Sequence, residues 1–169
     1  MSGGPLRDCR IARATAQDVP AILALIRGLA EYERLSAEVT ATEERLRESL
    51  FGAKPEAEAL VAWAGAEPVG IALFFQNYST FLARRGLYLE DLFVLPEWRK
   101  RGIGRKLFAR VAALAVERGC GRMEWAVLDW NEPAIGFYRK LGATVLEDWR
   151  ICRLTGDTLA ALARTSEAP

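Results

Sequence analysis

Residues 88–106 read Tyr88-Leu-Glu-Asp-Leu-Phe-Val-Leu-Pro-Glu-Trp-Arg-Lys-Arg-Gly-Ile-Gly-Arg-Lys106, a passage from an apolar strand into a basic, glycine-containing turn. A helical pattern starts immediately afterwards. Gly102 and Gly104 allow the backbone to turn sharply and bring its N–H groups close to a ligand, and the helix behind them contributes a partial positive charge at its N-terminus. This combination predicts a site that holds a pyrophosphate.

Five basic residues surround the two glycines: Arg99, Lys100, Arg101, Arg105 and Lys106. A solvated run of surface charge is the alternative, but the position between a strand and a helix start favours an anion site. Two other nucleotide motifs are excluded. The P-loop requires Gly-x4-Gly-Lys-Ser/Thr, and the dinucleotide fingerprint requires a third glycine where this chain has Leu107.

The composition indicates a globular chain, with 169 residues of which 51% are hydrophobic and 27% are charged. We expect a single domain over the whole chain, with an ordered core at about residues 8–163. The 23 basic and 22 acidic residues give a net charge of +1. Such a balance provides no general field that would attract nucleic acid, so we expect no nucleic-acid partner.

Cysteine and histidine content bears on location and on metals. The three cysteines are widely spaced and there is no histidine, so we expect no metal site and a reducing, cytoplasmic setting. Residues 1–6 lack the pattern of a secretion signal, and no apolar run is long enough to span a membrane. Without histidine, a general base must be a carboxylate, an amine, a tyrosinate or water.

Hydrophobic periodicity predicts a mixed α/β chain in the order strand, two helices, three strands, helix, strand, helix, strand. The strands are expected at residues 9–13, 57–63, 69–76, 87–94, 123–128 and 149–154. The main helices are expected at residues 19–30, 43–50, 103–118 and 133–141, and a short last helix is expected to end at residue 162.

Glu90 and Asp91 lie in the middle of the apolar strand 87–94, where an extended chain sends them to opposite faces of the sheet. A buried, unpaired charge is costly, so these carboxylates should be paired, hydrated through a cleft or shifted in pKa. That is the profile of functional carboxylates. The structural alternative is an ion pair or a position on a sheet edge.

Two residues near the fourth helix have ordinary structural explanations. Periodicity places Tyr138 beside Phe137, as one half of an aromatic core contact. Asn131 precedes Pro133 by two residues and fits a helix cap, because a side-chain oxygen there accepts a hydrogen bond from an unpaired backbone N–H. The residue types alone leave these interpretations and a functional one open.

Two motifs together resemble those of the GNAT N-acetyltransferase superfamily. Residues 99–105 resemble its Arg/Gln-x-x-Gly-x-Gly/Ala loop for the acyl-CoA pyrophosphate, and residues 131–143 resemble its late Asn-x-x-Ala-x-x-x-Tyr-x-x-x-Gly-Phe/Ala helix. More narrowly, Tyr32-Glu33, residues 88–94, residues 130–133 and Trp149-Arg150 resemble the diamine (spermidine/spermine) acetyltransferase family, including its thialysine-preferring relatives.

The resemblance implies an α/β (α+β) fold with a mixed, mostly antiparallel sheet flanked by helices on both faces. The sheet would be splayed between strands 87–94 and 123–128 to hold acetyl-CoA, and the protein would be a homodimer. The implied cofactor contacts are the backbone of Phe93 and Val94, the loop residues Arg99, Lys100, Arg101, Gly102, Ile103, Gly104, Arg105 and Lys106, and the side chains of Asn131 and Tyr138.

The implied reaction is direct attack of a primary amine on the thioester in a ternary complex, without a metal. Because the amine is protonated at neutral pH, it must first lose a proton, and Glu90 is the expected base, either with a raised pKa or through ordered water. A backbone N–H near Val94 would stabilise the oxyanion. Tyr138 would protonate the departing thiolate of CoA.

The expected substrate is a small cationic amine, either a polyamine or diamine or a thialysine-like amino acid. Glu33, Glu90 and Asp91 would attract the cation, and Trp149 would cover an alkyl chain or contact an ammonium group. Two alternatives remain. One is a module that binds acyl-CoA without turnover, and the other is an acetyltransferase that acts on protein or peptide amines.

Overall fold

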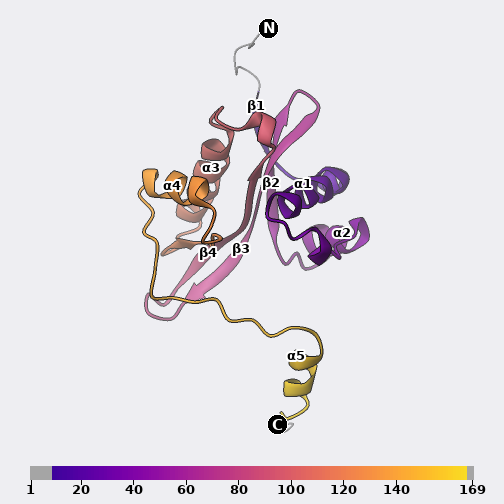
Figure 1. Cartoon of the computed structure of the whole chain (residues 1–169), viewed down its shortest axis with the longest axis vertical. Helices are drawn as coiled ribbons and strands as arrows, with labels where there is room; N and C mark the ends of the chain where they lie inside the picture. Colours follow the sequence, from indigo (N-terminus) through magenta and orange to yellow (C-terminus); the bar gives the residue numbers. More distant parts are fainter. Residues whose placement is uncertain (1–8, 167–169) are drawn as a thin grey trace. The chain divides into compact units, whose positions relative to one another are not determined.

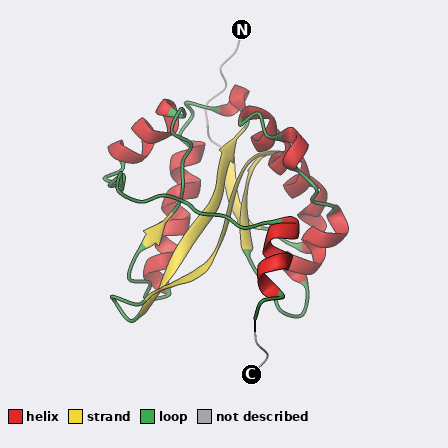
Figure 2. Ribbon diagram, turned by 60° about the horizontal axis from the view of Figure 1, so that its bottom comes forward, coloured by secondary structure: helices red, strands yellow, loops and turns green. Residues whose placement is uncertain are grey.

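The computed structural model describes residues 9–166, which form two compact units divided between Ala126 and Val127. Asp8, the first residue of the expected ordered core, and residues 1–6 lie outside the described part. The first unit contains a five-stranded sheet in the order β1-β2-β3-β4-β5 (Figures 1 and 2). Within the described residues, β4 and β5 are the parallel pair and the other neighbours are antiparallel. The prediction of a mixed, mostly antiparallel α/β fold is therefore confirmed.

The strands are unequal in length, and the shortest, β5, pairs with only a small part of β4. Their bounds are β1 Cys9–Arg13, β2 Glu58–Ala64, β3 Glu67–Ser79, β4 Arg84–Val94 and β5 Met123–Glu124. The last strand pairs with β4 at only two positions, Leu87 with Met123 and Tyr88 with Glu124. Residues 125–128 were predicted to continue this strand and do not. Beyond Tyr88, β4 therefore has no strand paired to its outer edge in the described part of the chain.

Helices cover both faces of the sheet, as predicted. Helices α1 (Val19–Tyr32) and α2 (Glu43–Phe51) pack on one face, and α3 (Ile103–Glu117) packs on the other (Figure 1). Short 3₁₀ turns at Ala16–Asp18, Ser36–Glu38 and Pro96–Trp98 connect these elements. Each helix buries the apolar stripe that its sequence predicts, for example Ile103, Leu107, Val111 and Leu114 on α3.

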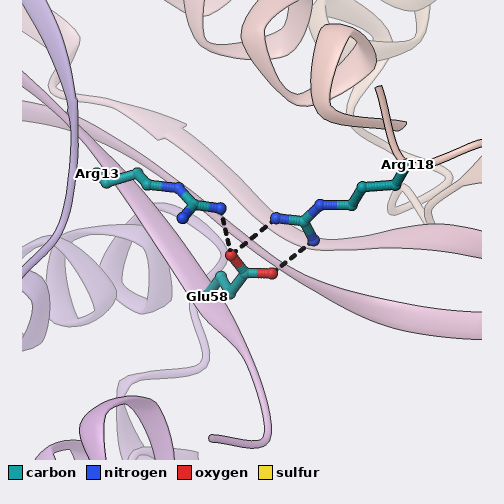
Figure 3. A network of polar contacts seen from close by, with 3 residues as sticks. All are labelled: Arg13, Glu58 and Arg118. Carbon is teal, nitrogen blue, oxygen red and sulfur yellow. Dashed lines mark hydrogen bonds and ion pairs between the residues drawn. The ribbon is translucent and has the colours of Figure 1, made fainter. Parts of the chain in front are cut away.

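A polar network ties the ends of three elements together in the first unit (Figure 3). Glu58, at the start of β2, accepts two hydrogen bonds from the guanidinium of Arg118, at 2.6 and 2.9 Å, and a third from Arg13 at 2.8 Å. The Arg118 hydrogen bonds are the main cause of a lowered pKa of Glu58. The network therefore links β1, β2 and the end of α3 through one carboxylate.

The second unit contains helix α4 (Glu132–Lys140) and helix α5 (Gly156–Ala163), joined by a long extended stretch (Figure 1). The predicted strand at residues 149–154 is wrong for this structure, since these residues are exposed and form no strand. A strand exists only through hydrogen bonds to a neighbour, and the alternation of apolar residues cannot provide that neighbour. The single-domain expectation stays a prediction. No helix within residues 9–166 is long and apolar enough to cross a membrane.

Candidate active site

Strand β4 carries a bulge at Glu90. Leu89 stands opposite Phe74 of β3 and Asp91 stands opposite the adjacent Leu73, so Glu90 is an extra residue without a partner in the ladder. Such an insertion bends the strand and changes which side chains share a face. The prediction that Glu90 and Asp91 alternate across a regular strand is therefore wrong, because the strand is not regular at this point.

The bulge moves Asp91 to the face covered by α1. Leu89 packs in the core cluster beneath α3, whereas Phe93 packs in the cluster formed with α1 and α2. In an unbroken strand Leu89, Asp91 and Phe93 would share one face. Since the register is regular from Asp91 to Phe93, Asp91 lies on the Phe93 face, toward the helix that carries Glu33.

Three carboxylates come together at this place. Glu33 directly follows the last residue of α1, and burial raises the pKa of its carboxyl group. Burial, followed by the charges of Glu90 and Glu33, raises the pKa of Asp91 to about 6. None of the three forms an ion pair within residues 9–166. The structure thus brings together the three predicted cation-attracting residues and leaves their charge uncompensated.

Tyr88 and Glu124 border this cluster and were not singled out by sequence reasoning. They face each other where β4 and β5 pair, and the charges of Glu90 and Glu124, after burial, raise the pKa of the Tyr88 hydroxyl. Asn77 donates a hydrogen bond to the Glu124 carboxylate at 3.2 Å, and Arg122 forms an ion pair with the same carboxylate at 2.8 Å. The relevant signal, a charged residue at the second position of the predicted strand 123–128, is visible in the sequence, but its neighbour across the sheet is not.

The glycine-containing turn has the backbone geometry expected of an anion site. Gly102 is the N-cap of α3 and adopts a left-handed conformation with φ 78°. The first intrahelical bond runs from Lys106 N to Gly102 O at 3.0 Å, so the preceding N–H groups of the first turn have no carbonyl partner within the helix. A side chain built at Gly102 would meet open space. The cradle is therefore accessible from outside.

The five predicted cradle cations have different environments. Lys100, Arg101, Arg105 and Lys106 are exposed, and Arg101 lies over the ring of Trp98 at 4.7 Å. Arg99 is half-buried, and its Nε donates a hydrogen bond to the carbonyl of Val94 at 3.0 Å. The structure therefore separates Arg99 from the other four.

The remaining predicted residues lie in the second unit. Asn131 caps α4, its side-chain oxygen accepting a hydrogen bond from Ala134 N at 3.3 Å, as the structural interpretation predicted. Tyr138 is buried, with its ring 5.3 Å from that of Phe137 in an edge-on arrangement, and Trp149 is exposed. The roles of Asn131, Tyr138 and Trp149 toward cofactor and substrate stay predictions. Within the described residues no group of three or more His, Cys, Asp or Glu side chains is arranged so that it could hold a metal ion.

Comparison with known proteins places these features in a family. The model of the acetyltransferase (GNAT) family matches residues 23–143. The chain is 43% identical over 164 residues to the thialysine N-epsilon-acetyltransferase of Bos taurus, covering 90% of this chain and 96% of that protein. It is 36% identical over 198 residues to the L-ornithine N5-acetyltransferase NATA1 of Arabidopsis thaliana, covering 90% of this chain and 87% of that protein.

A solved structure supports the fold independently. An integron cassette protein from the mobile metagenome of V. cholerae superposes with a TM-score of 0.78 at 23% identity, covering 92% of this chain and 98% of that one. The strand-to-helix junction, the mixed sheet and the sequence matches agree. The chain belongs to the GNAT acetyltransferase family and is an acyltransferase.

Proposed function

We propose that this protein transfers an acetyl group from acetyl-CoA to a primary amine of a small cationic substrate, by direct attack in a ternary complex. The observation that carries the substrate class is the uncompensated cluster of Glu33, Glu90 and Asp91. Carboxylates that share a site without a protein cation are stabilised when a cation binds. A protonated amine supplies that charge.

The cofactor site is assigned to the outer edge of β4 and the start of α3. The N–H groups of the first turn of α3 would bind the pyrophosphate, assisted by the exposed side chains of Lys100, Arg101, Arg105 and Lys106. Among residues 9–166 no strand pairs with the outer edge of β4 beyond Tyr88, so the backbone groups of this edge would bind the pantetheine arm. The bound group supplies the activated acetyl thioester.

Strand geometry refines the expected backbone contacts. In an antiparallel ladder successive residues direct their N–H and C=O alternately toward the partner and away from it. Leu95 N donates to Val69 O, on the β3 side, whereas the Val94 carbonyl is bonded by Arg99. Val94 and Leu92 therefore direct their backbone groups outward, and those of Phe93 point toward β3. We accordingly propose that the backbone of Leu92, in place of that of Phe93, contacts the pantetheine arm of the cofactor. The backbone contact expected of Val94 is kept.

For catalysis, this chain must remove a proton from the ammonium group, stabilise the oxyanion and protonate the leaving thiolate. Glu90 is exposed at the bulge and would accept the proton directly or through water, while Asp91 and Glu33 hold the charged amine. An outward backbone N–H of β4 would stabilise the oxyanion. Tyr138 would give its proton to the thiolate of CoA.

The names of two relatives bear on the choice of amine. They are named for thialysine and L-ornithine, which are amino acids with an amine at the end of the side chain. We propose that this chain acts on an amine of that kind or on a polyamine. The protein is further proposed to be a cytoplasmic homodimer, the location resting on three cysteines that form no disulfide among the described residues.

The proposed function is tested by measuring CoA release from acetyl-CoA with a panel of amines. The panel contains thialysine, ornithine, lysine, putrescine, spermidine, spermine and a peptide with a free amine, and protein without amine is the blank. Turnover with a small amine at a kcat/KM well above that of the peptide supports the proposal. Preference for the peptide would assign a protein substrate, and binding of acetyl-CoA without release for any amine would indicate a non-catalytic module.

A further inference from the structure

Arg99 makes contacts that differ from those of a phosphate-binding side chain. Its Nε donates to the carbonyl of Val94 at 3.0 Å, and its guanidinium carbon lies 4.2 Å from the ring centroid of Tyr32 and 5.7 Å from that of Phe93. No carboxylate pairs with it in the described part of the chain. The charge is therefore held by two aromatic rings and a backbone carbonyl, an arrangement that favours a planar cation.

These contacts join the two halves of the proposed site. Val94 ends β4, on the edge assigned to the cofactor, and Tyr32 is the last residue of α1, immediately before Glu33. A cation beside the C-terminal end of a helix is favoured by the helix dipole. Arg99 thus connects the end of the strand that would bind pantetheine to the end of the helix that carries an amine-binding carboxylate.

The hydrogen bond to Val94 also fixes an important backbone orientation. In an extended strand the N–H and C=O of one residue point to the same side. The Val94 carbonyl is bonded to Arg99 rather than to β3, so the Val94 N–H lies on the same outer edge. Holding the carbonyl limits rotation of this part of the strand, and so fixes where its N–H groups meet the thioester.

We propose that Arg99 is a positioning residue, which aligns the edge of β4 and the Glu33 end of α1, and that it does not bind the pyrophosphate. This inference rests on the proposed function, which assigns the edge of β4 to the cofactor and the Glu33 end of α1 to the amine. It separates Arg99 from Arg105, which is exposed in the first turn of α3 and makes no such contacts with the residues that the structure describes. The two arginines of one motif would then serve different steps.

The test compares Arg99→Met and Arg99→Lys with the matched control Arg105→Met. Affinity for CoA is measured by calorimetry at several salt concentrations, and kcat and KM are measured with the best amine of the panel. For Arg99→Met we expect kcat/KM for the amine to fall by about tenfold to a hundredfold, with the Kd for CoA changed less than about threefold. Arg99→Lys, which keeps the cation over Tyr32, should recover part of the loss.

The control Arg105→Met should lose mainly affinity for CoA, whereas Arg99→Met should lose mainly kcat/KM for the amine. Arg105→Met should weaken CoA binding by about threefold to tenfold and make it less dependent on salt, because a screened charge contact is lost. Measured at saturating acetyl-CoA, its kcat/KM for the amine should fall less than that of Arg99→Met. Equal loss of CoA affinity and kcat/KM in Arg99→Met, with reduced salt dependence, would make Arg99 a phosphate ligand. Tighter CoA binding in Arg99→Met would show that the side chain obstructs the cofactor, and either result would overturn the proposal.

A measurement on the ligand-free protein keeps the inference separate from the proposed function. Hydrogen exchange of the backbone amides is compared between the wild type and Arg99→Met, in the segments around Val94 and around Tyr32. Faster exchange in both segments, with little change elsewhere, supports the link between them. Unchanged exchange in either segment would overturn it, even if the wild type showed no turnover with any amine.

Discussion

Glu33, at the end of α1, and Asp91, on β4, lie close enough for the charge of Glu33 to raise the pKa of Asp91. These residues are far apart in the sequence, and the bulge at Glu90 brings Asp91 to the face of the sheet where Glu33 lies. Like charges held close together lower the free energy of unfolding, and they strengthen the binding of a cationic ligand.

Asp91→Asn should stabilise the fold and weaken amine binding. The folded-state pKa of about 6 exceeds the ordinary value of 3.8, so ionisation of Asp91 lowers stability as the pH rises from about 4 through 6. At about 1.4 kcal/mol for each pK unit, reduced because solvent reaches the group, the variant should gain about 1–2 kcal/mol at pH 8. The gain should disappear near pH 4.

The measurement is chemical unfolding at pH 4, 6 and 8, together with KM for the best amine, which should rise by about tenfold because one carboxylate is lost. Glu67→Gln, at the exposed start of β3, is the control and should change neither quantity. A loss of stability in Asp91→Asn at pH 8 would contradict the raised pKa.

Glu58 should show the opposite dependence on pH. Its hydrogen bonds with Arg118 lower its pKa, so its contribution to stability is full above the unfolded-state pKa and is lost as the pH falls through the folded-state value. Glu58→Gln should cost about 0.5–1.5 kcal/mol at pH 7, since the pair is partly exposed. Unfolding curves at pH 7, 5 and 3 should show a difference from wild type that is largest at pH 7 and becomes smaller as the pH falls. Glu117→Gln, which removes the exposed pair with Arg110, should have a smaller effect.

Gly102 and Gly119 offer a matched pair for the cradle. Both have positive φ, 78° and 68°, and a side chain would meet open space at either position. Alanine should therefore cost about 1 kcal/mol of stability at each through backbone strain alone. Only Gly102→Ala should weaken CoA binding, measured by calorimetry, because Gly102 begins the turn of N–H groups. Equal CoA affinity in the two variants would move the pyrophosphate away from this turn.

Tyr138→Phe should lower kcat far more than it weakens acetyl-CoA binding, because the hydroxyl is needed only as negative charge develops on the sulfur. A loss of about a hundredfold in kcat is consistent with removal of a general acid. The check is steady-state kinetics combined with calorimetric Kd for CoA. Phe137→Leu, on the neighbouring position of α4, controls for the ring contact. Parallel losses of kcat and affinity would make Tyr138 a packing or cofactor-binding residue.

Much of this architecture could be predicted from periodicity and motif. The helices at residues 19–32 and 103–117 follow from stripes of apolar residues, and the left-handed turn at Gly102 follows from a glycine placed between strand and helix. These features depend on local preferences of the chain. The family can be recognised from two motifs, residues 99–105 and residues 131–143, because their residue types and spacing are visible in the sequence alone.

Other features depend on neighbours that are distant in the sequence. Residues 149–154 have the alternation of a strand, but without a paired neighbour they form none. The bulge at Glu90 arises from the register between β3 and β4. The sequence of β4 contains no residue that predicts it. Regular alternation from Leu89 would put Asp91 on the face covered by α3, whereas the bulge puts it on the face covered by α1.

The amino-acid sequence by itself determined the order of most elements, the anion-binding turn and the family, because these depend on backbone preferences and local spacing. Only the tertiary structure decided that Asp91 shares a face with α1, that burial and then the charges of Glu90 and Glu33 raise its pKa, and that Arg99 contacts Val94 and Tyr32 instead of projecting into solvent. The reason is physical. Burial and charge interactions depend on distances through space, which are set by strand register and helix packing.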